Sequence, residues 1–366
     1  MPPRHANPNQ PRGATLTEVL AVLVCCLVAS AFMVPALAQV GHSVQFPNSM
    51  HKLRVLHEAL VCYAADWNGR QFTSVPDDLG VVGGSCGVYV NEFGCYPPLI
   101  AGIGCNNAWW SFGGLVCGFG GCSNFTRPLW FDPDLPAGVF RLPNVKPVHD
   151  YVDGRYYSPI FYAPLDHKAF DAARPAFGID CEYVEDVGLI PSSYMFSPAA
   201  MYHPDVMRAA SAGGFQDPDT IDHGYESPAV AQARHPSLKT WMIEHNWLRN
   251  PPGPCHPDYV DIYGAFSKEC DPYLFNHGAG AEPLTMFFDG SVRRLRTGDV
   301  EADDMKLLDQ TGGVDGLWSR DTPFGETGYY ADLSFDGTLV SHHVLTTDGI
   351  LGRDTLTRPA AKGRAR

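Results

Sequence analysis

The sequence lacks the short motifs by which the common hydrolase and nucleotide-binding sites are identified. It contains no G-x-S-x-G nucleophile elbow, no H-E-x-x-H zinc motif and no phosphate-binding Walker loop. Its cysteines form no C-x-x-C pair, the spacing that zinc sites and thioredoxin-like redox sites use. We therefore predict that the protein is not an enzyme and holds no cofactor.

Charged side chains are also scarce, at 18% of the residues. Lysine and arginine (26) are outnumbered by aspartate and glutamate (40), and the resulting net charge of -14 argues against a nucleic-acid partner. Glycine (37) and proline (31) are abundant, which predicts a loop-rich body that contains β-structure. With 366 residues, of which 45% are hydrophobic, the chain can form one or two domains with a sizeable core.

One long hydrophobic run, from Val19 to Ala38, has Ser30 as its only polar side chain. As a helix it is long enough to cross a hydrocarbon core of about 30 Å, and no second run of this length follows. A buried core helix and a cleavable secretory signal are two alternatives. The second is favoured by Arg4 and Arg12 before the run and by the small-x-small end of the run, before Gln39.

The residues that enter this run favour a third alternative, because Gly13-Ala14-Thr15-Leu16-Thr17-Glu18 resembles the type IV prepilin signature. That signature has a glycine before the cleaved bond and a glutamate at the fifth mature position. An acidic residue inside a membrane costs roughly 2.5–3.5 kcal/mol at a helix centre and less near an end. A secretory signal gains nothing from Glu18, whereas in a filament Glu18 can pair with the α-amino group of a neighbouring subunit's Ala14.

The resemblance implies a leader over residues 1–13 and a transmembrane assembly helix over residues 14–40. A prepilin peptidase would cut between Gly13 and Ala14 and methylate the new amine. The protein would then be a pilin or pseudopilin of a type IV pilus or a type II secretion system, with other subunits and the membrane as its partners. Its N-terminus would lie in the cytoplasm, with a single pass of the inner membrane and a periplasmic or extracellular body.

The cysteines predict an exported body. Of the 11 cysteines, Cys25 and Cys26 lie in the hydrophobic run, which leaves nine. In an oxidising compartment their density is typical of a disulfide framework, and the odd number leaves at least one thiol free or bonded to another chain. Five candidates for disulfides fall in one glycine-rich stretch: Cys86, Cys95, Cys105, Cys117 and Cys122.

The predicted fold class is α+β and pilin-like: the transmembrane helix, then an amphipathic helix within residues 41–69 that packs on an antiparallel β-sheet. We expect this helix to begin at Asn48 or Ser49 and to end at Asn68-Gly69. Its apolar stripe is expected to leave Lys52, Arg54 and Glu58 outside. The stripe consists of Leu53, Leu56, Leu60, Ala64 and Trp67.

Four further segments follow this helix. Residues 70–150 predict an irregular Cys/Gly-rich insertion, residues 151–352 an α+β body, and residues 353–366 a disordered basic tail. Within the body, strands are expected at Tyr156–Ala163 and Leu238–Glu244, the second half-buried because its side chains alternate. Asp-Gly turns predict hairpins at Thr285–Val292 and Leu333–Val340.

A second resemblance concerns His277, Asp289 and Gly290. Prepilin-like proteins abundant in planctomycete-type genomes carry a histidine, nine residues and then Asp-Gly near the C-terminus, and the stretch from His277 to Asp289-Gly290 is similar to that motif. Here eleven residues separate His277 from Asp289. Two weaker hypotheses remain beside the pilin-like function. One is a secreted, disulfide-stapled binding protein cut after Ala38, and the other is an exported hydrolase that uses His277 and Asp289.

The acidic run of Asp299, Glu301, Asp303 and Asp304 leaves Ca²⁺ as one conceivable ligand, because some secretion pseudopilins bind Ca²⁺ near their C-terminal ends. The run lacks the glycine of an EF-hand loop, and Gln310 stands where that loop has its final glutamate. A solvated helix start or loop is the interpretation that the sequence favours.

Overall fold

The structure is a computed structural model, and it describes two residues of the hydrophobic run and most of the body. The chain divides into two compact units, Met1–Pro47 and Asn48–Arg366, and the following paragraphs concern the second unit unless stated otherwise. The described residues are 20, 23, 46–72, 99–112, 127–132, 138–164, 166–218, 220–221, 224–244, 282–326, 328–329 and 340–357.

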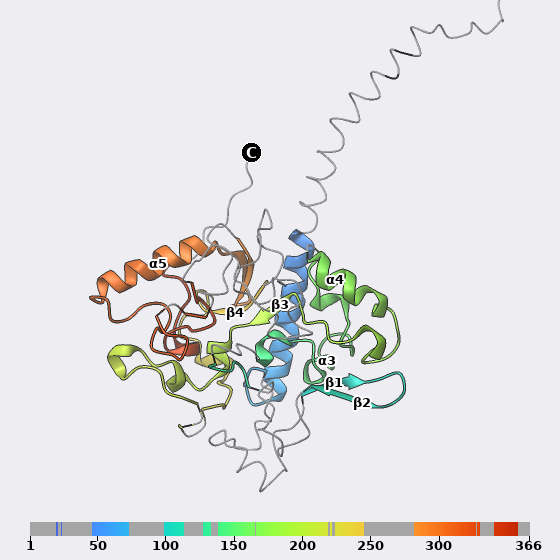
Figure 1. Ribbon diagram of the computed structural model, residues 1–366, viewed down its shortest axis with the longest axis horizontal. Helices are drawn as coiled ribbons and strands as arrows, with labels where there is room; N and C mark the ends of the chain where they lie inside the picture. Colours follow the sequence, from blue (N-terminus) through green and yellow to red (C-terminus); the bar gives the residue numbers. More distant parts are fainter. Residues whose placement is uncertain are drawn as a thin grey trace, which may run out of the picture. The chain divides into compact units, whose positions relative to one another are not determined.

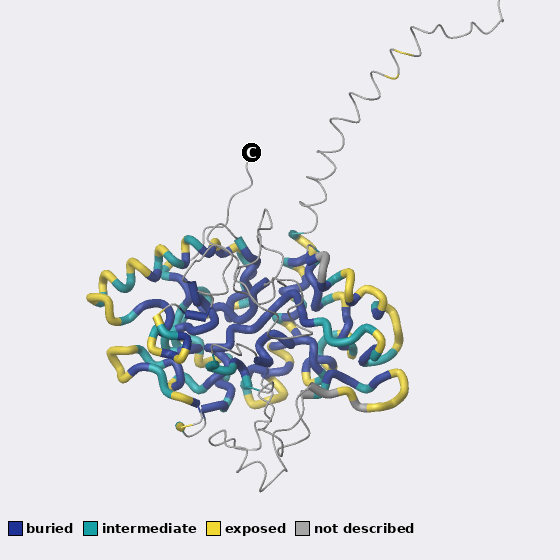
Figure 2. Tube along the Cα trace, viewed as in Figure 1, coloured by how far each residue is buried: buried dark blue, intermediate teal, exposed yellow. Residues whose placement is uncertain are grey.

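A four-stranded antiparallel sheet forms the centre of the body, with the strand order β3-β4-β5-β6 (Figure 1). Its strands are β3 (Tyr194–Phe196), β4 (Thr240–Glu244), β5 (Leu284–Phe287) and β6 (Val292–Arg294). Every residue of β3, β4 and β5 is buried, so the sheet is covered on both faces (Figure 2). The alternation in Leu238–Glu244 correctly predicts strand β4, but the half-buried character that it also predicts is wrong.

A β-bulge lies in β4, because Thr240 pairs with Phe287 and Met242 pairs with Met286. Trp241 is therefore an additional residue on the β4 side of the ladder. A bulge commonly re-aims a side chain, and here the Trp241 ring reaches His57 on a neighbouring helix.

That helix occupies residues 46–66 of the described chain and runs past strands β3 and β4 (Figure 1). It ends as Asn68-Gly69 predicts, since both residues have positive φ angles (54° and 81°) and the Gly69 N–H donates to the Ala64 carbonyl at 2.6 Å. The helix is already formed at residue 46, slightly before the start predicted near Asn48 or Ser49. Its buried stripe consists of Ser49, Lys52, Leu53, Leu56, Ala59, Leu60, Tyr63 and Ala64.

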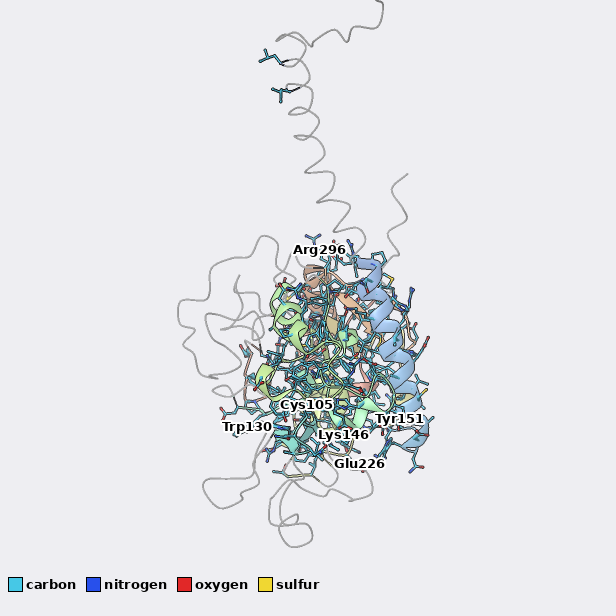
Figure 3. All side chains as sticks on the ribbon, turned by 90° about the vertical axis from the view of Figure 1, so that its right-hand side faces the viewer. Cys105, Trp130, Lys146, Tyr151, Glu226 and Arg296 are labelled. Carbon is cyan, nitrogen blue, oxygen red and sulfur yellow. A yellow bond between two sulfur atoms is a disulfide. The ribbon has the colours of Figure 1, made fainter. Side chains whose placement is uncertain are left out.

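Lys52 and Trp67 lie opposite to their predicted positions on this helix. Lys52 is buried, and its Nζ donates to the Pro159 and Tyr162 carbonyls at 2.8 and 2.7 Å. Burial lowers the pKa of Lys52 to about 8. Trp67 is 37% exposed, because the helix has already ended and the ring stacks on Tyr63 instead. The C-terminal end of the helix is held by Tyr151, whose hydroxyl donates to Asp66 at 2.9 Å (Figure 3).

A two-stranded ribbon and two short helices lie on one side of the central strands (Figure 1). The ribbon pairs β1 (Leu99–Ile103) with β2 (Trp109–Phe112), and the helices are α3 (Lys146–His149) and α4 (His167–Ala173). Part of the segment predicted to be an irregular insertion is therefore packed, because all residues from 138 to 145 are buried. The strand predicted at Tyr156–Ala163 is wrong, since Pro159–Phe161 forms a 3-10 turn.

Helix α5 (Thr297–Gln310) lies on the other side, near the C-terminal segment 340–357 (Figure 1). The predicted disordered tail begins too early, because Asp354 and Thr355 are 1% and 3% exposed and belong to the core. Short 3-10 turns make up much of the remaining body: Val139–Arg141, Arg174–Ala176, Glu185–Val187, Pro198–Met201, Pro204–Met207, Ala210–Ala212, Val230–Gln232 and Gly349–Leu351.

The predicted fold class, α+β with an N-terminal transmembrane helix in a pilin-like arrangement, is wrong. The body has an antiparallel sheet with few helices. Among the described residues, no helix combines the length and the apolar character that crossing a membrane requires. From the run Val19–Ala38 the description includes only Leu20 and Leu23, which are helical and 63% and 55% exposed. The remainder of that run lies outside the described residues.

Candidate functional site

The predicted Asp-Gly hairpin is present and joins β5 to β6. The Gly290 N–H donates to the Phe287 carbonyl at 2.9 Å, and the Phe287 N–H donates to the Ser291 carbonyl at 3.0 Å. Gly290 has a φ of 76°, a conformation that strongly favours glycine. This is a three-residue loop whose last residue is left-handed, one of the common hairpin connections. Asp289 stabilises it, because Oδ1 accepts the Ser291 N–H at 2.9 Å and also the Ser291 hydroxyl.

The hairpin loop packs against the helix 46–66 through aromatic rings. Phe288 stacks on Trp241 with a centroid distance of 4.8 Å, and Trp241 meets the His57 ring edge-on at 5.4 Å. Burial lowers the pKa of His57, although a hydrogen bond with the Phe288 backbone and the charge of Asp289 oppose that change. A Cβ at Gly290 would lie 2.7 Å from the His57 ring, so glycine is required there for space as well as for its φ angle.

A buried carboxyl at the end of β4 connects the same helix to the sheet. Glu244 is 0% exposed. Its Oε1 accepts the Ser49 hydroxyl, and its Oε2 accepts the Leu284 N–H at 2.9 Å. Ser49 also shares a 2.7 Å hydrogen bond with the Tyr194 hydroxyl. Burial raises the pKa of Glu244 to about 8, an effect that the nearby Asp166 charge reinforces. At neutral pH the group is therefore mainly a neutral carboxylic acid. Together these residues form what we call the Glu244 cluster (Ser49, Tyr194, Glu244 and Leu284).

A second buried polar group, the Lys239 cluster, lies just before β4 and consists of Ser197, Lys239, Thr346 and Asp354. Lys239 and Asp354 form an ion pair in which both side chains are 0% exposed. The Lys239 Nζ also donates to the Ser197 and Thr346 hydroxyls at 2.9 and 2.6 Å. Burial raises the pKa of Asp354, but the Lys239 charge and hydrogen bonds from Thr346 and the Thr240 N–H outweigh it, so the pKa is lowered.

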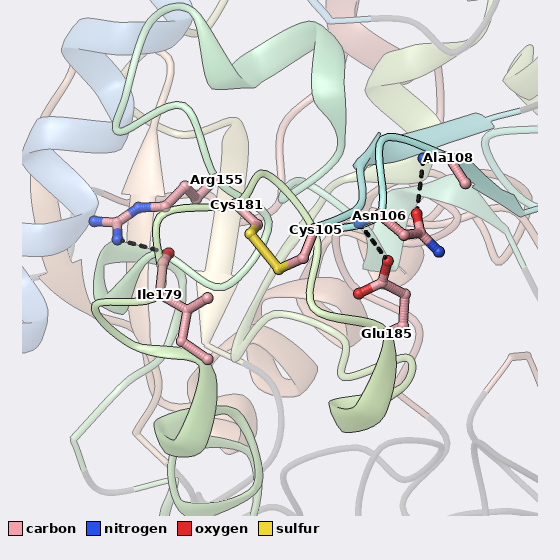
Figure 4. The surroundings of a disulfide bond; sticks show 7 residues. All are labelled: Cys105, Asn106, Ala108, Arg155, Ile179, Cys181 and Glu185. Carbon is pink, nitrogen blue, oxygen red and sulfur yellow. Dashed lines mark hydrogen bonds between the residues drawn. A yellow bond between two sulfur atoms is a disulfide. The ribbon is translucent and has the colours of Figure 1, made fainter.

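The disulfide in the described part of the chain joins Cys105 to Cys181, 76 residues later (Figure 4). Cys105 sits in the turn between β1 and β2, and the Cα–Cα distance of 5.3 Å is ordinary for a disulfide. Beside it, the Tyr183 N–H donates to the Ile103 carbonyl at 3.1 Å. The turn is further held because the Asn106 N–H donates to Glu185 at 3.4 Å. Cys62, on the helix, is free and exposed.

Of the residues that the sequence singles out, Cys105, Asp289 and Gly290 are described. The leader and assembly residues Gly13, Ala14 and Glu18, the motif histidine His277, and Cys86, Cys95, Cys117 and Cys122 lie outside the described residues. The second predicted hairpin, Leu333–Val340, also lies outside them except for its last residue. The structure brings Asp289-Gly290 onto His57.

The acidic run considered for Ca²⁺ belongs to helix α5, where two of its carboxylates have protein partners. Asp304 accepts the Leu317 N–H at 2.7 Å and pairs with Arg320. Asp303 accepts the Leu356 N–H at 2.7 Å. Within the described ranges, no group of three or more potential metal ligands comes together.

No family model, curated protein or solved structure matches this chain.

The sequence did not reveal either buried cluster. Lys239 precedes strand β4, and Glu244 is its last residue. The alternation of apolar and polar side chains in this strand suggested that the polar ones face water. Their partners, Asp354 and Ser49, lie 115 and 195 residues away in the chain. The only local signal was a charged residue at each end of an otherwise apolar strand, a pattern that is equally common for exposed strand ends.

Proposed function

We propose that the protein is a prepilin-type structural subunit. A prepilin peptidase cuts it between Gly13 and Ala14 and methylates the new Ala14 amine, and the mature chain associates with other subunits through its N-terminal segment. The observation that carries this proposal is the sequence Gly13 to Glu18 directly before an apolar run that ends at Ala38. On this proposal the protein is a building block rather than an enzyme.

The Cys105–Cys181 bond supports the part of the proposal that concerns location. Disulfides form and persist in oxidising compartments, and closure of a 76-residue loop stabilises a fold by about 4–5 kcal/mol. A body that depends on such a bond fits the periplasm or the cell exterior, and the peptidase-processed proteins are exported to those compartments.

The hairpin supports a structural role for the Asp-Gly motif. The Asp289 carboxylate is engaged by Ser291, within its own turn. Gly290 supplies the left-handed residue of that turn and makes room for His57. These contacts account for both residues of the motif without a catalytic task.

The test is the N-terminus of the mature chain. The full sequence is expressed in a bacterium that has a prepilin peptidase and in a matched strain without it, and the N-terminal peptide is identified by mass spectrometry. We expect N-methylated Ala14 only in the first strain. A mature chain that begins at Gln39 in both strains would overturn the proposal and favour the secreted binding protein.

A second variant separates processing from assembly. Because Glu18 pairs with the Ala14 amine of a neighbouring subunit, Glu18→Ala should be cleaved normally but lose association with co-expressed subunits, as measured by cross-linking. Thr17→Ala, one position earlier, is the matched control and should keep both properties. Unchanged association of Glu18→Ala would contradict the assigned role.

A further inference from the structure

The Lys239–Asp354 pair differs from the other ion pairs of the described residues. Both of its side chains are 0% exposed, whereas each of the others has at least one partner that is more than a quarter exposed. The amine and the carboxyl are thus held together where water does not compete for either. Such a setting holds the two reactants of an amide bond in one place.

The distances bring the reacting groups close. The Lys239 Nζ lies 3.3 Å from Asp354 Oδ1 and 3.1 Å from Oδ2. Because these two distances are nearly equal, the nitrogen lies on the plane that bisects the carboxyl group, close to both oxygens and to the carbon that joins them. Reacting atoms held about 3–3.5 Å apart gain much of the entropic advantage of an intramolecular reaction.

Fixed donors surround the carboxyl oxygens. Oδ1 accepts the Thr346 hydroxyl at 2.5 Å and the His343 N–H at 3.1 Å, and Oδ2 accepts the Thr240 N–H at 2.8 Å. Preorganised donors of this kind stabilise the negative charge that develops on oxygen when a nucleophile adds to a carbonyl carbon. Ser197 orients the amine from the other side through its 2.9 Å hydrogen bond with Nζ.

From this arrangement we propose that Lys239 and Asp354 condense to an intramolecular isopeptide bond. A proton first moves from the ammonium to the carboxylate, along a hydrogen bond that already exists, and leaves a neutral amine beside a carboxylic acid. The amine lone pair then attacks Cγ, a new N–C bond forms, a second N–H proton passes to the departing oxygen and the C–O bond breaks. One water molecule leaves, and the reaction needs no oxidant, reductant or other reactant.

Burial lowers the pKa of Lys239, which favours this first step, whereas the Lys239 charge and the donors around Asp354 lower the pKa of that carboxyl and oppose the step. The chain also contains an internal comparison. Glu244 is equally buried, but its partners are a hydroxyl and a backbone N–H, so no amine is placed to attack it. Lys52 is a buried amine that donates to two backbone carbonyls, which do not condense with it.

The bond would connect the residue before β4 to the C-terminal segment 340–357. This inference is independent of the proposed function, because it rests only on contacts within the body. If it holds while the N-terminal processing fails, the body is a covalently closed domain of some other exported protein.

Mass spectrometry of the purified full-length chain tests the proposal. After reduction and alkylation of the cysteines, the intact mass should be lower by one water molecule than the mass calculated for the alkylated chain with its observed N-terminus. A tryptic digest should contain a branched peptide that joins Lys239 to Asp354, and cleavage after Lys239 should be lost while cleavage after Lys306, on the exposed part of α5, continues. An unmodified mass with normal cleavage after Lys239 would overturn the proposal.

Variants give the reaction a second signature. Asp354→Asn should still form the bond but lose ammonia in place of water, because the amide nitrogen becomes the leaving group. Lys239→Arg keeps the charge but offers no nucleophilic amine, so its mass should equal the sequence mass. If Lys239→Arg does not fold, the mass of the unsubstituted chain still decides. If Lys239→Arg also loses one water molecule, the dehydration occurs at other residues and the Lys239–Asp354 bond is refuted.

Discussion

The Glu244 cluster and the Lys239 cluster differ in how each stabilises a buried carboxyl group. Each contains a carboxyl that is fully buried beside strand β4. Asp354 has an amine partner and a pKa below its usual value, whereas Glu244 has only hydrogen-bond donors and a pKa raised to about 8. A charge without a counter-ion is too costly to bury, so the carboxyl is ionic in the Lys239 cluster before it condenses with the amine, and it is neutral in the Glu244 cluster.

The two clusters also hold different parts of the chain. The Glu244 cluster connects the sheet to the helix 46–66, and the Lys239 cluster connects it to the C-terminal segment. Removal of one partner should therefore have unequal effects in the two clusters. Loss of Asp354 leaves the Lys239 charge buried without a counter-ion, whereas loss of the Glu244 carboxyl leaves no buried charge.

The largest effect is therefore expected for Asp354→Ala, which leaves the Lys239 ammonium buried without a counter-ion. We expect the free energy of unfolding to fall by about 3–5 kcal/mol, the usual result of breaking a buried pair. Urea unfolding followed by tryptophan fluorescence measures the change. Asp309→Ala, at an exposed position on α5, is the control and should stay within about 0.5 kcal/mol of the parent. An effect of Asp354→Ala as small as that of Asp309→Ala would show that Asp354 does not neutralise a buried charge.

The next effect is a pH dependence that belongs to Glu244. Its folded-state pKa of about 8 is above the ordinary glutamate pKa of 4.5, so its contribution to stability is complete below the lower value and is lost as the pH rises through the higher one. Between about pH 5 and pH 8 the parent should lose about 2–4 kcal/mol relative to Glu244→Gln, which has no proton to release.

The measurement is urea unfolding at several pH values for the parent, Glu244→Gln and Glu58→Gln. Glu58 lies on the helix 46–66 and is exposed, so its variant should follow the parent curve. Parallel curves for the parent and Glu244→Gln would show that Glu244 is ionised in the folded protein, in the same way as Asp354.

The smallest effect concerns the hairpin that packs on the helix beside the Glu244 cluster. Gly290→Ala imposes a left-handed φ on alanine, at a cost of about 1–2 kcal/mol, and also places a Cβ against His57. Gly312→Ala is the matched control, because Gly312 has a similar φ of 70° but nothing within 4 Å of its Cβ. Thermal unfolding should show a larger loss at Gly290, and a loss equal to that at Gly312 would mean that His57 yields freely.

Local patterns predicted the local features correctly. Asp-Gly between apolar runs gives the β5–β6 hairpin, Asn68-Gly69 ends the helix, and the alternation before Glu244 gives β4, because each depends on a few neighbouring residues. The half-buried face assigned to β4 was wrong, since burial depends on which distant segments cover the sheet.

The same limit explains the misplaced residues of the candidate site. Lys52 was assigned to the solvent because lysine is usually exposed, but its Nζ finds two carbonyls of the 3-10 turn near Pro159. Asp354 was assigned to a disordered tail because the segment from residue 353 is basic and lacks apolar periodicity. The Cys105 partner could not be chosen from spacing, because Cys181 lies outside the glycine-rich stretch that drew attention to the cysteines.

The central sheet also has short edges, with a consequence for behaviour at high concentration. The outer strands β3 and β6 have only three residues each, and β6 ends in Arg293 and the exposed Arg294. A short, charged edge is a poor template for a strand from another molecule. Copies of the body can therefore accumulate at high density with little risk of edge-to-edge aggregation.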